Sequence, residues 1–119
     1  MDKINIEEKL SLFNDYWNPK IIGEINESYV KLAKLKGDFV WHTHENEDEM
    51  FYVLKGTLTM KFREKSVQLN EGECLVIPSG IEHMPVAEEE VHVMLIESKT
   101  TLNTGNVTSE RTVKNLKQI

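Results

Sequence analysis

The stretch WHTHENEDEMFYVLKG, from Trp41 to Gly56, places two histidines one residue apart, follows them with acidic residues and then turns apolar. On a β-strand, side chains two positions apart leave the same face about 6.6 Å from each other. We therefore expect His42 and His44 to point to one site, close enough for both imidazoles to bind one ion. If the next segment pairs with the histidine segment through the acidic loop, Glu49 arrives opposite the histidines.

A second segment, EGECLVIPSGIEHMP, carries another histidine between apparent turns. The turn around Pro78 and Gly80 would direct the chain back into the interior, and His83 with it. A lone histidine is more often a packing residue than a ligand. Three of the chain's four histidines, together with one carboxylate, fall in these two hairpins, and this grouping favours a metal site.

Most of the chain has the pattern of short strands separated by turn residues, which indicates an all-β sandwich or closed barrel. The candidate strands are KIIGEI, SYVKLAKL, DFVWHTH, EMFYVLKG, LTMKFRE, SVQLN, CLVIP, HMPVA and VHVMLIES. Before them, the apolar spacing in INIEEKLSLF predicts a short helix over residues 4–13. Residues 104–119 are polar, and we expect a lightly anchored extension that contributes little to metal binding.

The composition sets limits on class and partners. A chain of 119 residues fits one domain, here residues 1–119, and 29% charged with 39% hydrophobic residues is ordinary globular composition. No apolar run approaches the roughly 20 residues of a membrane span, and the N-terminus is acidic and polar where a signal peptide would be basic and then apolar. We therefore expect a cytoplasmic protein without a membrane partner. The net charge of −6 argues against nucleic acid.

Three further residues have side chains of types that often occur in functional sites. Cys74, the single cysteine, shares a strand face with Val76 and is expected in the core. His92 is expected to be a packed or surface histidine. Glu47, in the acidic loop, is expected to remain solvated and to leave metal binding to Glu49.

Together, the two histidine segments resemble the paired motifs of the cupin superfamily, in particular its small single-domain members, which are often named after mannose-6-phosphate isomerase. The first motif is filled by Gly37, His42, His44, Glu49 and Gly56, and the second by Gly72, Pro78, Gly80 and His83. The resemblance covers residues 37–87. Two departures are visible: only four residues separate Gly37 from His42, and Ala87 stands where the family often has Asn.

The resemblance implies a cupin double-stranded β-helix, or jelly-roll barrel, after the short N-terminal helix. It also implies one divalent transition metal inside the barrel, with four ligands: His42, His44, Glu49 and His83. Three neutral nitrogens and one carboxylate suit Zn, Fe, Mn, Ni, Co or Cu, whereas Ca and Mg prefer more oxygen ligands. Four protein ligands on an octahedral ion leave two positions for water, substrate or dioxygen.

Two functions of different class remain open. The first is a metal-dependent enzyme acting on a small polar metabolite, by sugar-type isomerisation or epimerisation or by dioxygenation. The second is a non-catalytic module that binds a small ligand. No cluster of Arg or Lys lies beside the predicted site, which argues against a sugar phosphate. We also expect a homodimer, because an open barrel leaves strand edges that a second copy can pair, with the segment before Gly37 as the donor.

Overall fold

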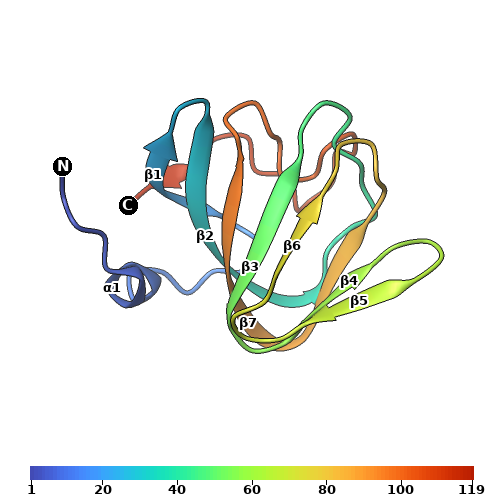
Figure 1. Ribbon diagram of the computed structural model, residues 1–119, viewed down its shortest axis with the longest axis horizontal. Coiled ribbons are helices and arrows are strands. Elements are labelled where there is room, and N and C mark those ends of the chain that lie inside the picture. Colours follow the sequence, from blue (N-terminus) through green and yellow to red (C-terminus); the bar gives the residue numbers. More distant parts are fainter.

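The computed structural model describes residues 1–119 as one short helix followed by eight strands that curl around a common interior (Figure 1). The helix α1 spans Ile6–Leu10, and the strands are β1 (Lys20–Ile25), β2 (Ser28–Asp38), β3 (Glu49–Lys55), β4 (Leu58–Lys61), β5 (Ser66–Leu69), β6 (Cys74–Ile77), β7 (Met84–Ser98) and β8 (Lys117–Gln118). The expected all-β jelly-roll barrel with a short N-terminal helix is confirmed.

The long strand β7 connects the two sides of the barrel. It pairs antiparallel with β2 in both its first and its second part, whereas β4 pairs only with the first part and β3 only with the second. The ladder with β2 skips the three exposed glutamates Glu88–Glu90, where the strand bends. The predicted strands HMPVA and VHVMLIES are therefore one bent strand.

The core follows from the alternation of side chains along the strands. In β3, every second residue from Glu49 to Val53 is buried, and the fully buried Leu58, Met60 and Val93 fill the same interior. A second, smaller cluster lies outside the sheet, where Leu10 and Phe13 pack on Leu32. The helix and the segment after it thus cover part of the outer face.

The helix is shorter than the predicted 4–13. Its N-terminus is fixed by Asn5, whose side-chain oxygen accepts a hydrogen bond from the Glu8 N–H at 3.0 Å. An Asn in this capping position is extended rather than helical, so the helix begins after it. No helix in the structure has the length and apolar character needed to cross a bilayer.

Two expectations about strands are wrong. The segment DFVWHTH is not a strand, because β2 ends at Asp38 and the histidines that follow make only an isolated bridge. Cys74 is exposed rather than in the core. The inward positions of β6 are Leu75, which packs against the core, and the buried Ile77, so Cys74 and Val76 face outward.

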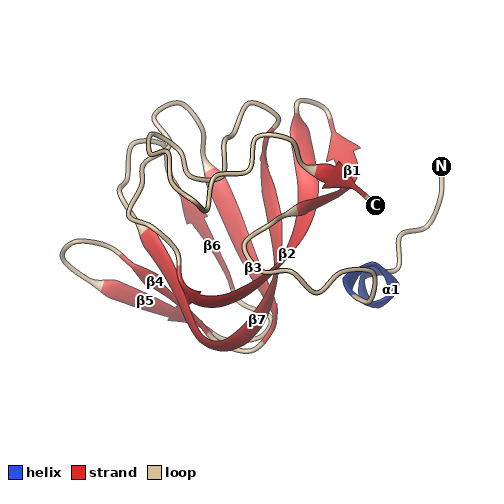
Figure 2. Ribbon diagram, turned by 180° about the vertical axis from the view of Figure 1, so that it is seen from behind, coloured by secondary structure: helices blue, strands red, loops and turns tan.

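The C-terminal segment is also anchored more firmly than expected. Thr104 is fully buried, and its hydroxyl lies 2.6 Å from the Val107 carbonyl and 2.7 Å from the Thr112 hydroxyl. At its end, β8 pairs in parallel with β1. Between these points the segment crosses the upper end of the barrel in the view of Figure 2. The segment is polar because hydrogen bonds hold it in place. The pattern of apolar residues in the sequence does not indicate anchoring of this kind.

Candidate metal centre

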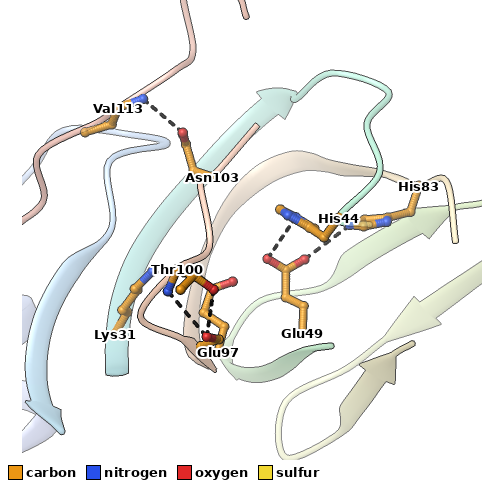
Figure 3. A network of polar contacts seen from close by, with 9 residues as sticks. Lys31, His44, Glu49, His83, Glu97, Thr100, Asn103 and Val113 are labelled. Carbon is orange, nitrogen blue, oxygen red and sulfur yellow. Dashed lines mark hydrogen bonds and ion pairs between the residues drawn. The ribbon is translucent and has the colours of Figure 1, made fainter. Parts of the chain in front are cut away.

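Four buried side chains meet inside the barrel, and they are the four predicted metal ligands. His42, His44, Glu49 and His83 each offer one ligand atom, and these atoms all lie within 4.8 Å of one another. None of the four residues is more than 4% exposed. In Figure 3 the Glu49 carboxylate points at the rings of His44 and His83. The structure therefore brings the whole predicted set together.

The three histidines are held by backbone contacts between loops. The N–H of His42 donates to the His83 carbonyl at 3.1 Å, and the N–H of His83 donates to the His42 carbonyl at 3.0 Å. The His44 carbonyl accepts from the Gly80 N–H at 2.8 Å. The turn that carries His83 is thus tied to both ends of the His-x-His segment. These bonds hold the histidines together although the segment is not a regular strand.

Glu49 reaches the histidines from a different direction than expected. It is the first residue of β3, which pairs with β6 and β7 rather than with the histidine segment. Its Oε1 lies 3.2 Å from Nε2 of His83, and its Oε2 lies 3.5 Å from Nε2 of His44. The carboxylate thus spans two of the three rings from the wall of the barrel.

The tautomers of two histidines follow from their hydrogen bonds. Nδ1 of His42 lies 2.9 Å from the Val40 carbonyl, and Nδ1 of His83 lies 2.8 Å from the Ile81 carbonyl. A carbonyl only accepts, so each Nδ1 carries the proton. In the neutral rings, Nε2 is then left with a lone pair, which is the form that binds a metal.

Burial keeps these histidines neutral. Loss of solvent contact, followed by the neighbouring His83, lowers the pKa of His42 to about 3. Burial is also the largest cause that lowers the pKa of His44 and of His83. Near neutral pH the three rings therefore offer lone pairs without first having to lose protons.

The carboxylate is affected in the opposite direction. Burial raises the pKa of Glu49 above its ordinary value. Because Nδ1 of His83 already carries a proton, Nε2 of a neutral His83 can join the 3.2 Å contact only by accepting a hydrogen bond from a protonated Glu49 carboxyl group. Glu49 thus tends to hold a proton that a bound cation would displace.

The residues present fit a divalent transition metal. Both ring nitrogens of His44 are buried and have no hydrogen-bond partner. A buried polar atom left in this way costs about 1–3 kcal/mol, and a metal bond to one nitrogen would remove part of that cost. Three imidazoles and one carboxylate are also the donor set that such metals take. When bound, the ion would supply a Lewis acid and open coordination positions.

A second carboxylate lies beside the cluster, and the sequence analysis missed it. Glu97 on β7 is the cross-strand neighbour of Glu49, and its Oε1 accepts from Lys31 Nζ at 2.9 Å, with both side chains buried (Figure 3). Burial, and then the charge of Glu49, raises the pKa of Glu97 to about 8, although Lys31 acts against this. The signal was present in the sequence, because Glu97 continues the inward alternation of Val93 and Leu95.

The cluster opens on a small apolar cavity. Its apolar lining includes Trp17, Leu35, Phe39, Phe51 and Leu95, and its polar lining includes His42, Glu49 and Glu97. The cavity volume is about 40 Å³, which is room for about three water-sized groups. No Lys or Arg lines it. A ligand in this cavity would be small and would meet no free cation.

The other residues singled out in the sequence lie outside the cluster. Glu47 accepts a hydrogen bond from the Thr100 hydroxyl at 3.0 Å. His92, whose side chain is 12% exposed, contacts the exposed Glu90 at 2.6 Å, which agrees with the expected packed or surface histidine.

Comparison with known proteins places the fold and the paired motifs in a family. Residues 28–99 match the sequence profile of the cupin domain family. The chain belongs to this family. A solved cupin-2 domain protein of Shewanella frigidimarina is 48% identical to it, with a TM-score of 0.80, and the match covers 81% of this chain and 94% of that one. The cupin resemblance drawn from the two motifs is thus confirmed.

Two curated relatives match this cupin over shorter stretches. The uncharacterized protein YdbB of Bacillus subtilis is 40% identical over 63 residues, which are 52% of this chain and 56% of YdbB. Acireductone dioxygenase of Yarrowia lipolytica is 40% identical over 75 residues, which are 57% of this chain and 42% of that enzyme. The chain thus spans about half the length of the curated relatives it matches.

Proposed function

We propose that this cupin binds one divalent transition metal through His42, His44, Glu49 and His83 and uses it to convert a small oxygen-bearing metabolite. The observation that carries the proposal is the meeting of four buried ligand atoms within 4.8 Å beside a cavity. The metal is one of Zn, Fe, Mn, Ni, Co or Cu by donor set.

The cavity favours a ligand without phosphate. Its lining contains no Lys or Arg, and the one buried cation next to the cluster, Lys31, is already bonded to Glu97. A phosphate group would therefore have no cation to neutralise it, and it would face two carboxyl groups. The apolar wall and the volume of about 40 Å³ favour a compact, partly apolar molecule or one short end of a longer molecule.

The residues that line the cavity have different roles in this proposal. Trp17, Phe39 and Phe51 enclose the apolar part of the ligand and exclude water. Glu97 carries an oxygen, Oε2, that is buried without a hydrogen-bond partner. Because burial raises its pKa to about 8, this carboxyl group can hold or accept a proton near neutral pH.

Among the reactions that fit, we place dioxygenation first. Dioxygen is small and apolar and suits this cavity, and one curated relative carries the name acireductone dioxygenase. Isomerisation or epimerisation of an unphosphorylated sugar-type substrate is the second candidate, because the position of Glu97 beside the cluster suits proton transfer at carbon.

A substrate screen with metal-loaded protein tests the proposal. We expect the iron-loaded protein to consume dioxygen, measured with an oxygen electrode, in the presence of a compact hydroxyketone or 2-keto acid. Sugar phosphates should be inert. Isomerisation would instead appear as deuterium entering the substrate from D₂O, followed by NMR. The His83→Ala variant is the control, and it should lose either activity.

The alternative is a non-catalytic cupin that holds its ligand unchanged. Ligands that raise the melting temperature of the metal-loaded protein, without dioxygen consumption or deuterium exchange by any of them, would support this alternative and contradict the enzymatic proposal.

We further propose that the chain forms a homodimer. The outer edge of β6 has no partner strand, and Val76 on it is 57% exposed. The donor expected from the sequence, the segment before Gly37, is less suited. Its second strand, β2, is already paired with β1 and β7, and β8 occupies the edge of β1 at Lys20 and Ile21. Sedimentation at tens of micromolar should give twice 13.8 kDa, and a species of 13.8 kDa alone would contradict the dimer.

A further inference from the structure

The residue between the two clustered histidines is held by the C-terminal segment. The N–H of Asn106 donates to the Thr43 carbonyl at 3.0 Å, and the N–H of Thr43 donates to Oδ1 of Asn106 at 2.9 Å. Both backbone polar groups of Thr43 are thus bonded to one residue that lies 63 positions away in the chain. The peptide units on either side of Thr43 lead directly to His42 and His44, so Asn106 restrains the backbone that carries both rings.

Gly105 makes an even closer approach to the same segment. A Cβ atom at this position would lie 2.3 Å from the Thr43 carbonyl oxygen and 3.3 Å from Cδ2 of the His42 ring. Gly105 also has a φ of +55°, a backbone conformation that residues other than glycine rarely adopt. A larger residue here would push the His42–His44 backbone and the C-terminal segment apart.

The segment that makes these contacts is itself held in place. Asn103 donates through Nδ2 to the Arg111 carbonyl at 2.7 Å. Its Oδ1 accepts from the Val113 N–H at 2.9 Å, as Figure 3 shows. With the buried hydroxyl of Thr104, these bonds close a loop over residues 103–113. Gly105 and Asn106 therefore contact the histidine segment from a loop that hydrogen bonds hold in place.

We infer that Gly105 and Asn106 are positioning residues for the metal centre, acting through the backbone of Thr43 on His42 and His44. In a regular strand, a neighbouring strand would hold the two histidines in register, but β2 ends at Asp38 before it reaches them. His42 and His44 are bonded to the turn that carries His83, and Asn106 adds a pair of bonds at Thr43 between them. Supports of this kind orient ligands before the metal arrives, and their loss typically costs 10–100-fold in affinity. The inference rests on the proposed metal function.

Titration of the metal-free full-length chain with Co²⁺ tests the inference, with calorimetry for the Kd and visible absorption for the coordination of the ion. Asn106→Leu removes the acceptor of the Thr43 N–H at similar size, and Gly105→Ala moves the segment. We expect each variant to raise the Kd about 10–100-fold and to alter the Co²⁺ spectrum. Asn106→Asp keeps an oxygen acceptor at the same place and should restore both to near the values of the unchanged chain.

Two matched controls separate positioning from general loss of stability. Gly56 also has a positive φ, and a Cβ there would lie 2.8 Å from the Glu90 carbonyl, but it follows β3 at the end opposite Glu49. Gly56→Ala should lower the melting temperature and leave the Kd for Co²⁺ unchanged. Asn115→Leu makes the same exchange as Asn106→Leu at an exposed position of the C-terminal segment and should change neither.

The outcomes distinguish this inference from the proposed function. If the unchanged chain binds no Co²⁺, both are overturned. If it binds Co²⁺ and Asn106→Leu does so with the same Kd and spectrum, the inference alone is overturned. The same holds if Gly56→Ala weakens binding as much as Gly105→Ala. If Gly105→Ala does not fold, the comparison of Asn106→Leu with Asn106→Asp tests the positioning role by itself.

Discussion

Replacing Glu49 with glutamine is expected to weaken binding of a divalent transition metal by more than about 100-fold, because loss of a direct ligand should exceed the 10–100-fold typical of supporting residues. Glu49 supplies the single carboxylate of the four-residue cluster, 3.2 Å from His83 and 3.5 Å from His44. Glutamine preserves the shape of the side chain, so the change removes the negative charge and one oxygen ligand while keeping the packing. Calorimetric titration of the metal-free protein measures the effect.

Glu47→Gln is the matched control. Glu47 contacts Thr100 in the acidic loop and lies outside the cluster. Its replacement should leave the Kd within a few-fold of the unchanged chain. If Glu47→Gln removes metal binding and Glu49→Gln retains it, the assignment of the carboxylate ligand is wrong.

Metal binding should release about one proton near pH 7, and that proton should come from the carboxyl pair rather than from a histidine. The lowered pKa of His42, about 3, and the lowered pKa values of His44 and His83 mean that these rings are already neutral at pH 7. The raised pKa values of Glu49 and Glu97, about 8 for Glu97, mean that the pair still holds a proton there. A bound cation favours the charged carboxylates and expels that proton.

The sign of the pH dependence follows. As the pH falls from 8 to 6, more carboxyl groups hold protons in the metal-free protein, so the metal must displace more of them and its Kd rises. One proton per metal corresponds to about a tenfold change in Kd per pH unit. Below pH 6.5, where free histidine takes up protons, the buried rings should add little to the loss of metal affinity. This differs from an expectation based on ordinary histidine pKa values, which places a steep loss between pH 7.5 and 5.5.

Calorimetry in two buffers of different ionisation enthalpy counts the protons released. Glu97→Gln should lower that count at pH 7 and flatten the dependence of Kd on pH between 6 and 8. Glu90→Gln is the control, because Glu90 is exposed on the outside of the barrel and has a lowered pKa. Proton release that persists in Glu97→Gln and follows an apparent pKa near 6.5 would assign the proton to the histidines instead.

Local patterns in the sequence were sufficient to predict an all-β fold, and the resemblance to the cupin motifs added the jelly-roll barrel and the set of four clustered residues. Alternation along EMFYVLKG places Glu49 on the buried face with Phe51 and Val53, as the structure has it. The one-residue spacing of His42 and His44 predicts that they approach one site, and they do so even without a strand, because the segment bridges to His83. The family motif supplied the connection between the two hairpins.

Other features depend on contacts between distant parts of the chain, which local patterns do not encode. Thr104 looks like one more polar residue of a polar tail, yet it is fully buried by a loop that closes on itself. Lys31 and Glu97, 66 residues apart, become an ion pair only when β2 and β7 align. In each strand alone, a charged residue on the inward face gives no sign of its partner.

The most direct test of the metal centre is elemental analysis of untagged protein after growth with supplemented metals and dialysis, paired with the same analysis of His83→Ala. The account predicts close to one transition-metal ion per chain in the unchanged protein and far less than one in His83→Ala, with circular dichroism showing that the variant keeps its β structure. A content near zero in the unchanged protein, with Zn, Fe, Mn, Ni, Co and Cu each supplied, would contradict it, as would equal content in a folded His83→Ala.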